Sequence, residues 1–252
     1  MSVATFRTRL QRGDRLLGTI VSIAAPEAVE ILADSGFDWL FIETEHAPIG
    51  PLELQRMIIA ARDVPCVVRL PNHDEIEIKR ALDAGAAGII VPQVNTAAQA
   101  RAIVAFAKYP PAGRRGVGLA RANGYGYQVA DAVARANAET AIIVQAEHID
   151  AVNNIEEIVQ VPGVDTVFVG PYDLSASMGK LGQLSDPAVV AAIARVRDTA
   201  RKAGLSLGFF ATSPDLVAPQ LAAGFTLVAC GVDTLFLRQG ARAVAEALAK
   251  RP

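Results

Sequence analysis

Short apolar segments rich in Val, Ile and Phe recur along the whole chain. There are eight of them, and most are apolar at consecutive positions rather than at alternate ones. This pattern is typical of parallel strands that helices cover on both faces of a sheet. The predicted strands are 18–23, 38–43, 66–70, 87–92, 141–147, 166–170, 205–211 and 226–230.

The segments between these strands carry apolar residues at spacings of three and four, which predicts amphipathic helices. The clearest are 51–62, 74–84, 96–107, 187–203, 214–223 and 234–249. Residues that favour helix starts precede several of them, namely Asp74, Asn95 or Thr96, Asp186, Ser213 and Asp233. Glycines suited to a left-handed helix end stand at Gly36, Gly85, Gly204 and Gly224.

Eight strand–helix units in 252 residues predict a (β/α)₈ TIM barrel, with residues 1–252 as a single domain. A doubly wound open sheet is the competing α/β architecture. The chain lacks both a Gly-x-Gly-x-x-Gly motif after its first strand and a phosphate-binding Gly-x-x-x-x-Gly-Lys motif. One long segment, 108–128, is rich in Gly, Pro and Arg, and we expect it on the catalytic face after the fourth strand.

Composition narrows the classes of partner. Lys and Arg number 24 against 26 Asp and Glu, and neither sign forms a block, which argues against nucleic acid and membrane surfaces as partners. The N-terminal segment shows no apolar signal sequence, so a cytoplasmic protein is expected. Two cysteines, Cys66 and Cys230, lie in apolar runs and are expected to be buried and inert.

Polar side chains gather where the predicted strands end, which is where barrel enzymes place their active sites. The second strand runs into Glu43 and His46, and the third carries Arg69 among apolar neighbours. The fifth has Gln145 and Glu147 two residues apart, hence on one face, and the sixth runs into Asp173.

Glu147 and Asp173 follow successive strands and should stand side by side at the barrel mouth. Two adjacent carboxylates repel each other, and a divalent cation would relieve that repulsion. Oxygen ligands without clustered Cys or His favour Mg²⁺ or Mn²⁺. The alternative is structural, with Glu147 paired to an arginine and Asp173 capping the next helix.

Arg69 needs a partner for its charge, either a glutamate in the barrel or an anionic substrate. His46 lies near Glu43 and Glu45 and could act as a general acid or base oriented by a carboxylate, although a lone histidine is more often structural. No Gly-x-Ser-x-Gly motif is present, and none of the five lysines lies in a predicted strand, which argues against a Schiff-base aldolase.

Several motifs, in order along the chain, resemble the HpcH/HpaI family of metal-dependent (class II) pyruvate aldolases. They are FDWLFIETEHAP (37–48), VVRLP (67–71), YPPAGRRGVG (109–118), VQAE (144–147), FVGPYDLSASMG (168–179) and GVDTLFL (231–237). The resemblance covers residues from about 15 to 248. One departure stands at the active site, where position 43 is Glu and similar members carry Asp.

The resemblance implies roles for individual residues. Glu147 and Asp173 would bind a divalent cation (Mg²⁺, Mn²⁺ or Co²⁺), with no organic cofactor. Arg69 would hold the pyruvate carboxylate, and His46, oriented by Glu43, would be the acid or base at the aldehyde-derived oxygen. The implied substrate-binding residues are Arg69, Gln145, Gly170, Pro171, Tyr172 and Phe210.

The implied reaction is reversible cleavage of 4-hydroxy-2-oxoacids into pyruvate and an aldehyde through a pyruvate enolate whose charge the metal stabilises. The family likeness also implies a homohexamer, a trimer of dimers that exchange a C-terminal helix within 233–249. Two alternatives stay open. One is a carbon–carbon lyase acting on a CoA thioester, for which the Arg-rich segment 108–121 is the candidate nucleotide-binding strip. The other is a catalytically silent barrel that serves as a binding module.

Overall fold

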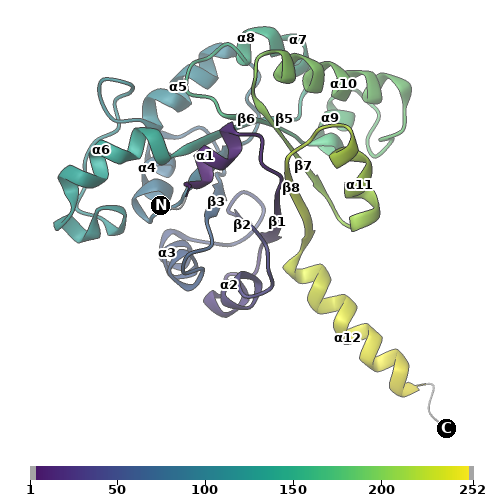
Figure 1. Cartoon of the computed structure of the whole chain (residues 1–252). Coiled ribbons are helices and arrows are strands. Elements are labelled where there is room, and N and C mark those ends of the chain that lie inside the picture. Colours follow the sequence, from purple (N-terminus) through teal and green to yellow (C-terminus); the bar gives the residue numbers. More distant parts are fainter. Residues whose placement is uncertain (1–3, 250–252) are drawn as a thin grey trace.

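The chain folds into a closed barrel of eight parallel strands in sequential order, each strand hydrogen-bonded to the next and β8 to β1 (Figure 1). The computed structural model describes residues 4–249. The predicted TIM barrel is confirmed, and the doubly wound sheet is excluded because the sheet closes. The strands are β1 (Leu16–Val21), β2 (Trp39–Glu43), β3 (Cys66–Arg69), β4 (Gly88–Val91), β5 (Ala141–Ala146), β6 (Thr166–Val169), β7 (Ser206–Ala211) and β8 (Leu227–Val232).

Helices surround the barrel, and all six predicted from periodicity are present within one or two residues of their expected bounds. The helices are α1 (Phe6–Gln11), α2 (Pro26–Ala33), α3 (Pro51–Ala60), α4 (Glu75–Asp83), α5 (Ala97–Ala107), η1 (Arg121–Gly126, a 3₁₀ helix), α6 (Val129–Glu139), α7 (Ile149–Asn153), α8 (Ile155–Ile158), α9 (Pro171–Ser177), α10 (Pro187–Lys202), α11 (Pro214–Ala222) and α12 (Asp233–Ala249).

Most of the expected helix starts are confirmed. Asp74, Thr96 and Asp186 are N-caps whose side chains accept backbone N–H groups. Ser213 holds the N-cap position without a side-chain bond. Asp233 is instead the first residue of α12, and its carboxylate accepts hydrogen bonds from Ser22 and Ile23, which directly follow β1. The expected glycines at helix ends all have positive φ.

Two apolar clusters divide the core, one between the strands and the helices and one inside the barrel. The interior cluster contains the rings of Trp39, Phe41 and Phe168, which pack at centroid distances of 5.9 Å. Gly18 faces this cluster because a Cβ there would lie 2.5 Å from the Trp39 indole nitrogen. At the amino end, α1 closes the barrel by placing Phe6 against Trp39.

Asp165, just before β6, ties α1 to the amino end of the barrel. Its buried carboxylate accepts from Arg7 Nε at 2.8 and 2.9 Å, from Gln11 Nε2 at 3.1 Å and from the Ile142 backbone N–H at 3.0 Å. All four hydrogen bonds lie at this one carboxylate, so its removal would leave a guanidinium without its carboxylate partner and a backbone donor unpaired.

We expect Asp165→Ala to lower the free energy of unfolding by about 3–5 kcal/mol, as breaking a buried ion pair does. The matched control is Asp198→Ala, which removes an exposed pair with Arg197 and should change the free energy of unfolding far less, because water screens such a pair. Denaturant unfolding of both variants measures the difference. Equal losses would mean that Asp165 does not lock α1 onto the barrel.

The segment 108–128 lies at the amino end of the barrel, so its expected position on the catalytic face is wrong. It follows α5, and a helix that follows a strand returns the chain to the end where the next strand begins. Lys108 Nζ accordingly donates to the Thr140 carbonyl, one residue before β5. Arg115 pairs with Asp83 at 2.6 Å, at the end of α4 and close to the start of β4. The segment also includes η1 and leads into α6.

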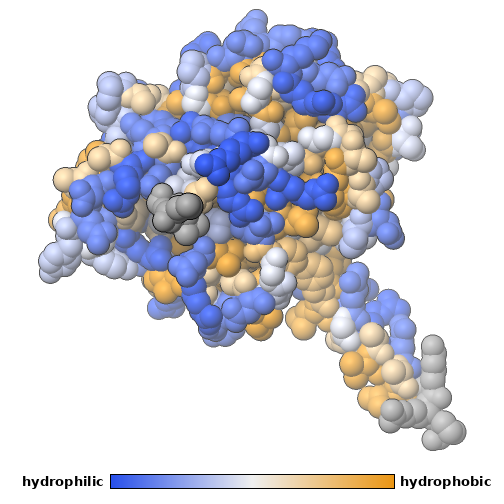
Figure 2. All heavy atoms as spheres, viewed as in Figure 1, coloured by the Kyte–Doolittle hydropathy of each residue, from blue (hydrophilic) through white to orange (hydrophobic). Residues whose placement is uncertain are grey.

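Helix α12 extends away from the barrel (Figure 1). Beyond Leu235 its described side chains are all exposed, including Leu237, Val244 and Leu248. Figure 2 shows apolar residues on the surface of this helix. Among the helices of residues 4–249, none combines the length and the hydropathy that crossing a bilayer would require.

Candidate active site

Four polar side chains project into the carboxyl end of the barrel from the positions that the strand alternation predicts. Glu43 follows the inward residues Trp39 and Phe41 of β2, and it is paired in register with Arg69 at the end of β3. Gln145 lies in β5 and Glu147 directly follows its last residue, both on the face that points into the barrel. The structure therefore brings Glu43, Arg69 and the β5 pair to one mouth, as the sequence predicts.

Arg69 is held by carboxylates on one side and by an aromatic ring on another. Its Nη2 donates to Glu43 Oε2, its Nε lies 3.3 Å from Glu45 Oε2, and its guanidinium carbon lies 5.4 Å from the centre of the Phe41 ring. The side chain is 13% exposed. Since Arg69 has a glutamate partner in the barrel, the structural alternative holds in part, and the exposed part of the guanidinium is what a substrate anion can contact.

Glu147 is a buried carboxylate with no cation among its recorded partners in residues 4–249. It is 2% exposed, and it accepts the Gln93 backbone N–H at 2.8 Å and the side-chain amide of Gln145. Burial raises the pKa of Glu147 to about 7, against the two hydrogen bonds, which lower it. The structural alternative of an arginine partner for Glu147 is not what the described residues show. A positive charge at this place would stabilise the ionised form.

Two more oxygen atoms beside this carboxylate lack a hydrogen-bond partner among the described residues. They are Gln145 Oε1 and Glu45 Oε2, both buried. Burial also raises the pKa of Glu45, mainly against the charge of Arg69. Gly170 keeps the space open, because a Cβ there would lie 2.9 Å from Glu147 Oε2 and 3.1 Å from Gln145 Nε2. The site thus presents oxygen donors around a space that a side chain at position 170 would fill.

Helix α9 begins directly after β6 and brings Pro171, Tyr172 and Asp173 to the mouth in its first turn. Asp173 is exposed, and its charge adds to the rise in the pKa of both Glu147 and Glu45. The predicted neighbourhood of Glu147 and Asp173 is therefore present. Tyr172 is exposed, and Phe210 of β7 is half-buried against the interior cluster.

His46 lies at the rim, with its side chain 70% exposed and its Nε2 3.7 Å from Glu45 Oε2. The resemblance implied that Glu43 orients the imidazole of His46, but the Glu43 carboxylate contacts the backbone instead. Its Oε1 accepts the backbone N–H groups of Glu45 and His46, at 2.7 and 3.1 Å. Glu43 therefore shapes the turn after β2, and Glu45 is the carboxylate nearest the His46 ring. The sequence places both Glu43 and Glu45 near His46, and the family resemblance assigned the orienting role to Glu43, so Glu45 had no predicted role of its own.

Within residues 4–249, no buried lysine lies at this mouth, and neither cysteine is a candidate nucleophile there. Of the four lysines in residues 4–249, Lys108 is the buried one; burial lowers its pKa to about 8, but it lies at the opposite end of the barrel. Lys250 falls outside the described residues. Cys66 is buried as expected and burial raises its pKa to about 12, whereas Cys230 is only half-buried.

A parallel barrel with carboxylates and an arginine at its carboxyl end is typical of TIM-barrel enzymes. Comparison with known proteins identifies the family. The model of the HpcH/HpaI aldolase/citrate lyase family matches residues 17–239. The chain belongs to this family.

The relatives extend over nearly the whole chain. The hydroxypyruvate/pyruvate aldolase of Sagittula stellata is 41% identical over 94% of this chain and 95% of its own length. The 4-hydroxy-2-oxo-heptane-1,7-dioate aldolase of Klebsiella pneumoniae is 40% identical over 95% of this chain and 92% of its own. The crystal structure of a family member from Burkholderia cenocepacia matches with a TM-score of 0.93 and 35% identity, covering 97% and 98% of the two chains. The predicted family and the prediction of an aldolase are confirmed.

Proposed function

We propose that this aldolase joins pyruvate, or the related 2-oxoacid hydroxypyruvate, to an aldehyde and cleaves the resulting 4-hydroxy-2-oxoacids in reverse. The observation that carries the proposal is the buried Glu147 carboxylate, with no cation among its recorded partners in residues 4–249 and with the Gln145 Oε1 atom beside it lacking a hydrogen bond, at the same mouth as Arg69. This pairing of a cation site with an anion site suits a substrate whose carboxylate and 2-oxo group are adjacent. The names of the relatives support the same substrate class.

We assign a divalent metal ion to Glu147 and Asp173. The donors near Glu147 are oxygen atoms of carboxylates and of the Gln145 amide, which favour Mg²⁺ or Mn²⁺ over softer metals. Within residues 4–249 no three His, Cys, Asp or Glu side chains form a complete metal-binding group. Two protein carboxylates would therefore hold the ion and leave its other positions to water and substrate oxygens, as Mg²⁺ sites commonly do.

When bound, this ion supplies Lewis-acid stabilisation of the negative charge that develops on the 2-oxo oxygen. Arg69 holds the substrate carboxylate, and Glu43 keeps the guanidinium in place. Transfer of a proton from C3 to a basic group at the mouth leaves an enolate, whose C3 attacks the carbonyl carbon of the aldehyde. The new alkoxide then takes a proton from His46, whose exposed side chain at the rim can reach the aldehyde. Gln145 and the backbone near Gly170 and Tyr172 shape the pocket for the 2-oxoacid.

The test of this proposal is an assay of pyruvate and hydroxypyruvate with a panel of aldehydes, using enzyme stripped of metal and then supplied with Mg²⁺, Mn²⁺ or Co²⁺. Aldol products should form only after a metal is restored. Product formation in excess EDTA would contradict the metal assignment, and no product with any aldehyde in the presence of metal would contradict the proposed reaction.

Arg69→Lys keeps the charge but loses the planar guanidinium. We expect kcat/KM for the 2-oxoacid to fall by at least about tenfold, roughly 1.4 kcal/mol, as for a charged bidentate contact. The matched control is Arg101→Lys, an exposed position on α5. Unchanged kcat/KM in Arg69→Lys would limit this residue to its ion pair with Glu43.

The oligomer is a second part of the proposal. Most of α12 is not covered by its own chain, and a helix of this length generally depends on packing of its apolar side chains. We assign this surface to a second copy, in a homohexamer built as a trimer of dimers that exchange α12. Light scattering of Leu237→Glu should show a smaller assembly than the wild type, and an unchanged assembly would contradict the exchange.

No observation favours either alternative function. The CoA-lyase interpretation relied on arginines of segment 108–121 near the catalytic mouth, and Arg115 lies at the opposite end of the same barrel. Chains named citrate lyase resemble this one at 15% identity or less, which supports the shared fold alone.

A further inference from the structure

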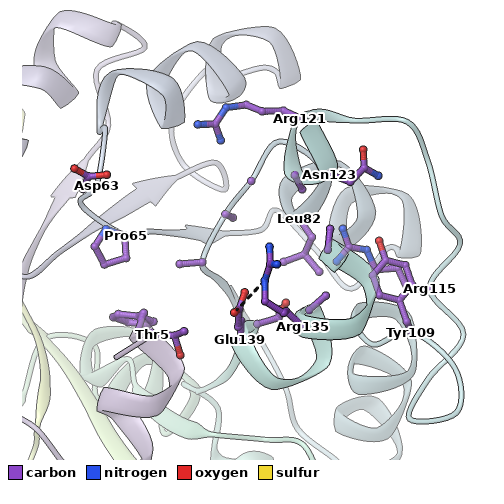
Figure 3. A pocket seen from close by; sticks show the side chains of 18 of the residues that line it. Thr5, Asp63, Pro65, Leu82, Tyr109, Arg115, Arg121, Asn123, Arg135 and Glu139 are labelled. Carbon is purple, nitrogen blue, oxygen red and sulfur yellow. Dashed lines mark ion pairs between the residues drawn. The ribbon is translucent and has the colours of Figure 1, made fainter. Parts of the chain in front are cut away.

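A cavity of about 710 Å³ lies at the amino end of the barrel, opposite the candidate active site (Figure 3). It is bounded by the residues just before β3, β4 and β5, by the start of α1, and by η1 and α6. This volume falls within the roughly 300–1,000 Å³ of small-molecule sites. None of the functions proposed above uses this cavity.

Four arginines line it, and three of them are paired with carboxylates. Two of the arginines already have carboxylate partners at the surface. Arg9 donates to Asp38 at 2.8 Å, and Arg135 pairs with Glu139, the next turn of α6, at 3.5 Å. The other two, Arg115 and Arg121, come from the Arg-rich segment that was expected on the catalytic face; Arg115 pairs with Asp83, and Arg121 has no carboxylate partner recorded among residues 4–249.

Arg115 is buried, with only 4% of the residue exposed. Its Nη2 donates to Asp83 at 2.6 Å and its guanidinium lies over the Tyr109 ring, 4.7 Å from the centre. Its Nε is also buried and has no hydrogen-bond partner among the described residues. A buried N–H group of a charged side chain without an acceptor costs free energy, and an anion in the cavity is a suitable acceptor.

Arg121 has no carboxylate partner recorded in residues 4–249. One of its nitrogens, Nη1, donates to the Ala84 carbonyl at 3.0 Å. The guanidinium lies against Gly85, whose φ is +101°, and a Cβ at that position would collide with Nη1. Figure 3 shows Arg121 at one side of the cavity and Arg115, beside Tyr109, at another. The backbone at Gly85 thus admits an arginine whose charge no side chain of the described part neutralises.

We propose that this cavity binds a small organic or inorganic anion with Arg121 as the main cationic contact, at a site separate from the candidate active site. Carboxylate and phosphate groups share the chemistry that a guanidinium recognises, namely planar or tetrahedral oxygens that accept paired N–H donors. The ligand contacts the starts of β3, β4 and β5, whose opposite ends carry Arg69, Gln93 and Glu147.

Calorimetric titration of the full chain with citrate and with inorganic phosphate, at constant ionic strength, tests the proposal and distinguishes the two anion types. At least one probe should bind with a Kd below about 1 mM, and Arg121→Gln should weaken that binding at least about tenfold, as for the loss of a charged contact. Two variants should bind as the wild type does. They are Arg101→Gln, an exposed charge change elsewhere, and Arg69→Lys, which alters the candidate active site.

Three outcomes would overturn the proposal: neither probe binds, Arg121→Gln binds as tightly as the wild type, or only Arg69→Lys weakens binding. Arg121 is partly exposed and forms no recorded ion pair among residues 4–249, so its substitution should leave the fold intact. A thermal melt of each variant without anion checks this. The buried Arg115 is not used for the test because its removal would also unpair Asp83.

Discussion

Replacing Glu147 by Gln is expected to lower kcat/KM for aldol cleavage by about 10³ or more, because Lewis-acid stabilisation contributes several kcal/mol. Glutamine has nearly the same shape, and its amide oxygen can still accept the Gln93 N–H at this position. The fold should therefore persist while one of the two carboxylates that hold the metal is lost. Calorimetric titration with Mn²⁺ should show a matching loss of affinity.

The control for this variant is Glu157→Gln, an exposed glutamate on α8 with no recorded ion pair among the described residues. It should bind Mn²⁺ and cleave substrate as the wild type does. If Glu147→Gln bound Mn²⁺ as tightly as the wild type, the metal would be held elsewhere and the assignment of Glu147 would be wrong.

The second large effect concerns His46. We expect His46→Ala to slow both aldol addition and aldol cleavage by about 10²–10⁴, the usual share of a positioned acid or base. Enolisation of pyruvate needs the cation site and Arg69 but no proton donor at the aldehyde oxygen. The variant should therefore retain more of its exchange of pyruvate C3 protons with D₂O than of its aldol rate.

The exchange rate of the same His46→Ala preparation serves as the internal control, since a misfolded site would lose both reactions. Equal losses in exchange and aldol rates would mean that His46 removes the C3 proton itself or supports the cation site. Glu43→Gln should not reproduce the selective pattern of His46→Ala. Its carboxylate contacts Arg69 and the backbone of the turn, so both rates should fall together.

The sequence predicts the barrel well because each strand is a short apolar run between helices of clear periodicity. Six α-helices of the described residues were not named from the sequence. Of these, α1, α7, α8 and α9 have only four to seven residues, too few for the spacing of apolar positions to show, whereas α2 and α6 are longer. The misplacement of 108–128 has a different origin. That segment follows α5 rather than β4, and the topology of a barrel alone puts it at the amino end.

In the candidate site, the alternation of side-chain direction along a strand predicts the residues in strands but not those in the turns after them. Glu43 and Arg69 are in strands, so their inward direction follows from the pleat. Glu45 lies after the end of β2, in a turn whose backbone N–H groups bind Glu43. This turn returns Glu45 to Arg69 and His46, and no periodicity in the sequence records it. The family resemblance therefore pairs the His46 ring with Glu43, whereas the structure places Glu45 nearest to it.

We propose that a divalent metal at Glu147 and Asp173 lowers the pKa of the C3 protons of pyruvate by stabilising the enolate. Proton NMR of pyruvate in D₂O measures this directly, without an aldehyde, in enzyme treated with EDTA and then supplied with Mg²⁺. Exchange of the methyl protons should fall to the uncatalysed rate after chelation and return with Mg²⁺, and it should not return in Glu147→Gln. Undiminished exchange in excess EDTA, or a pyruvate–lysine adduct trapped by borohydride, would contradict the proposal.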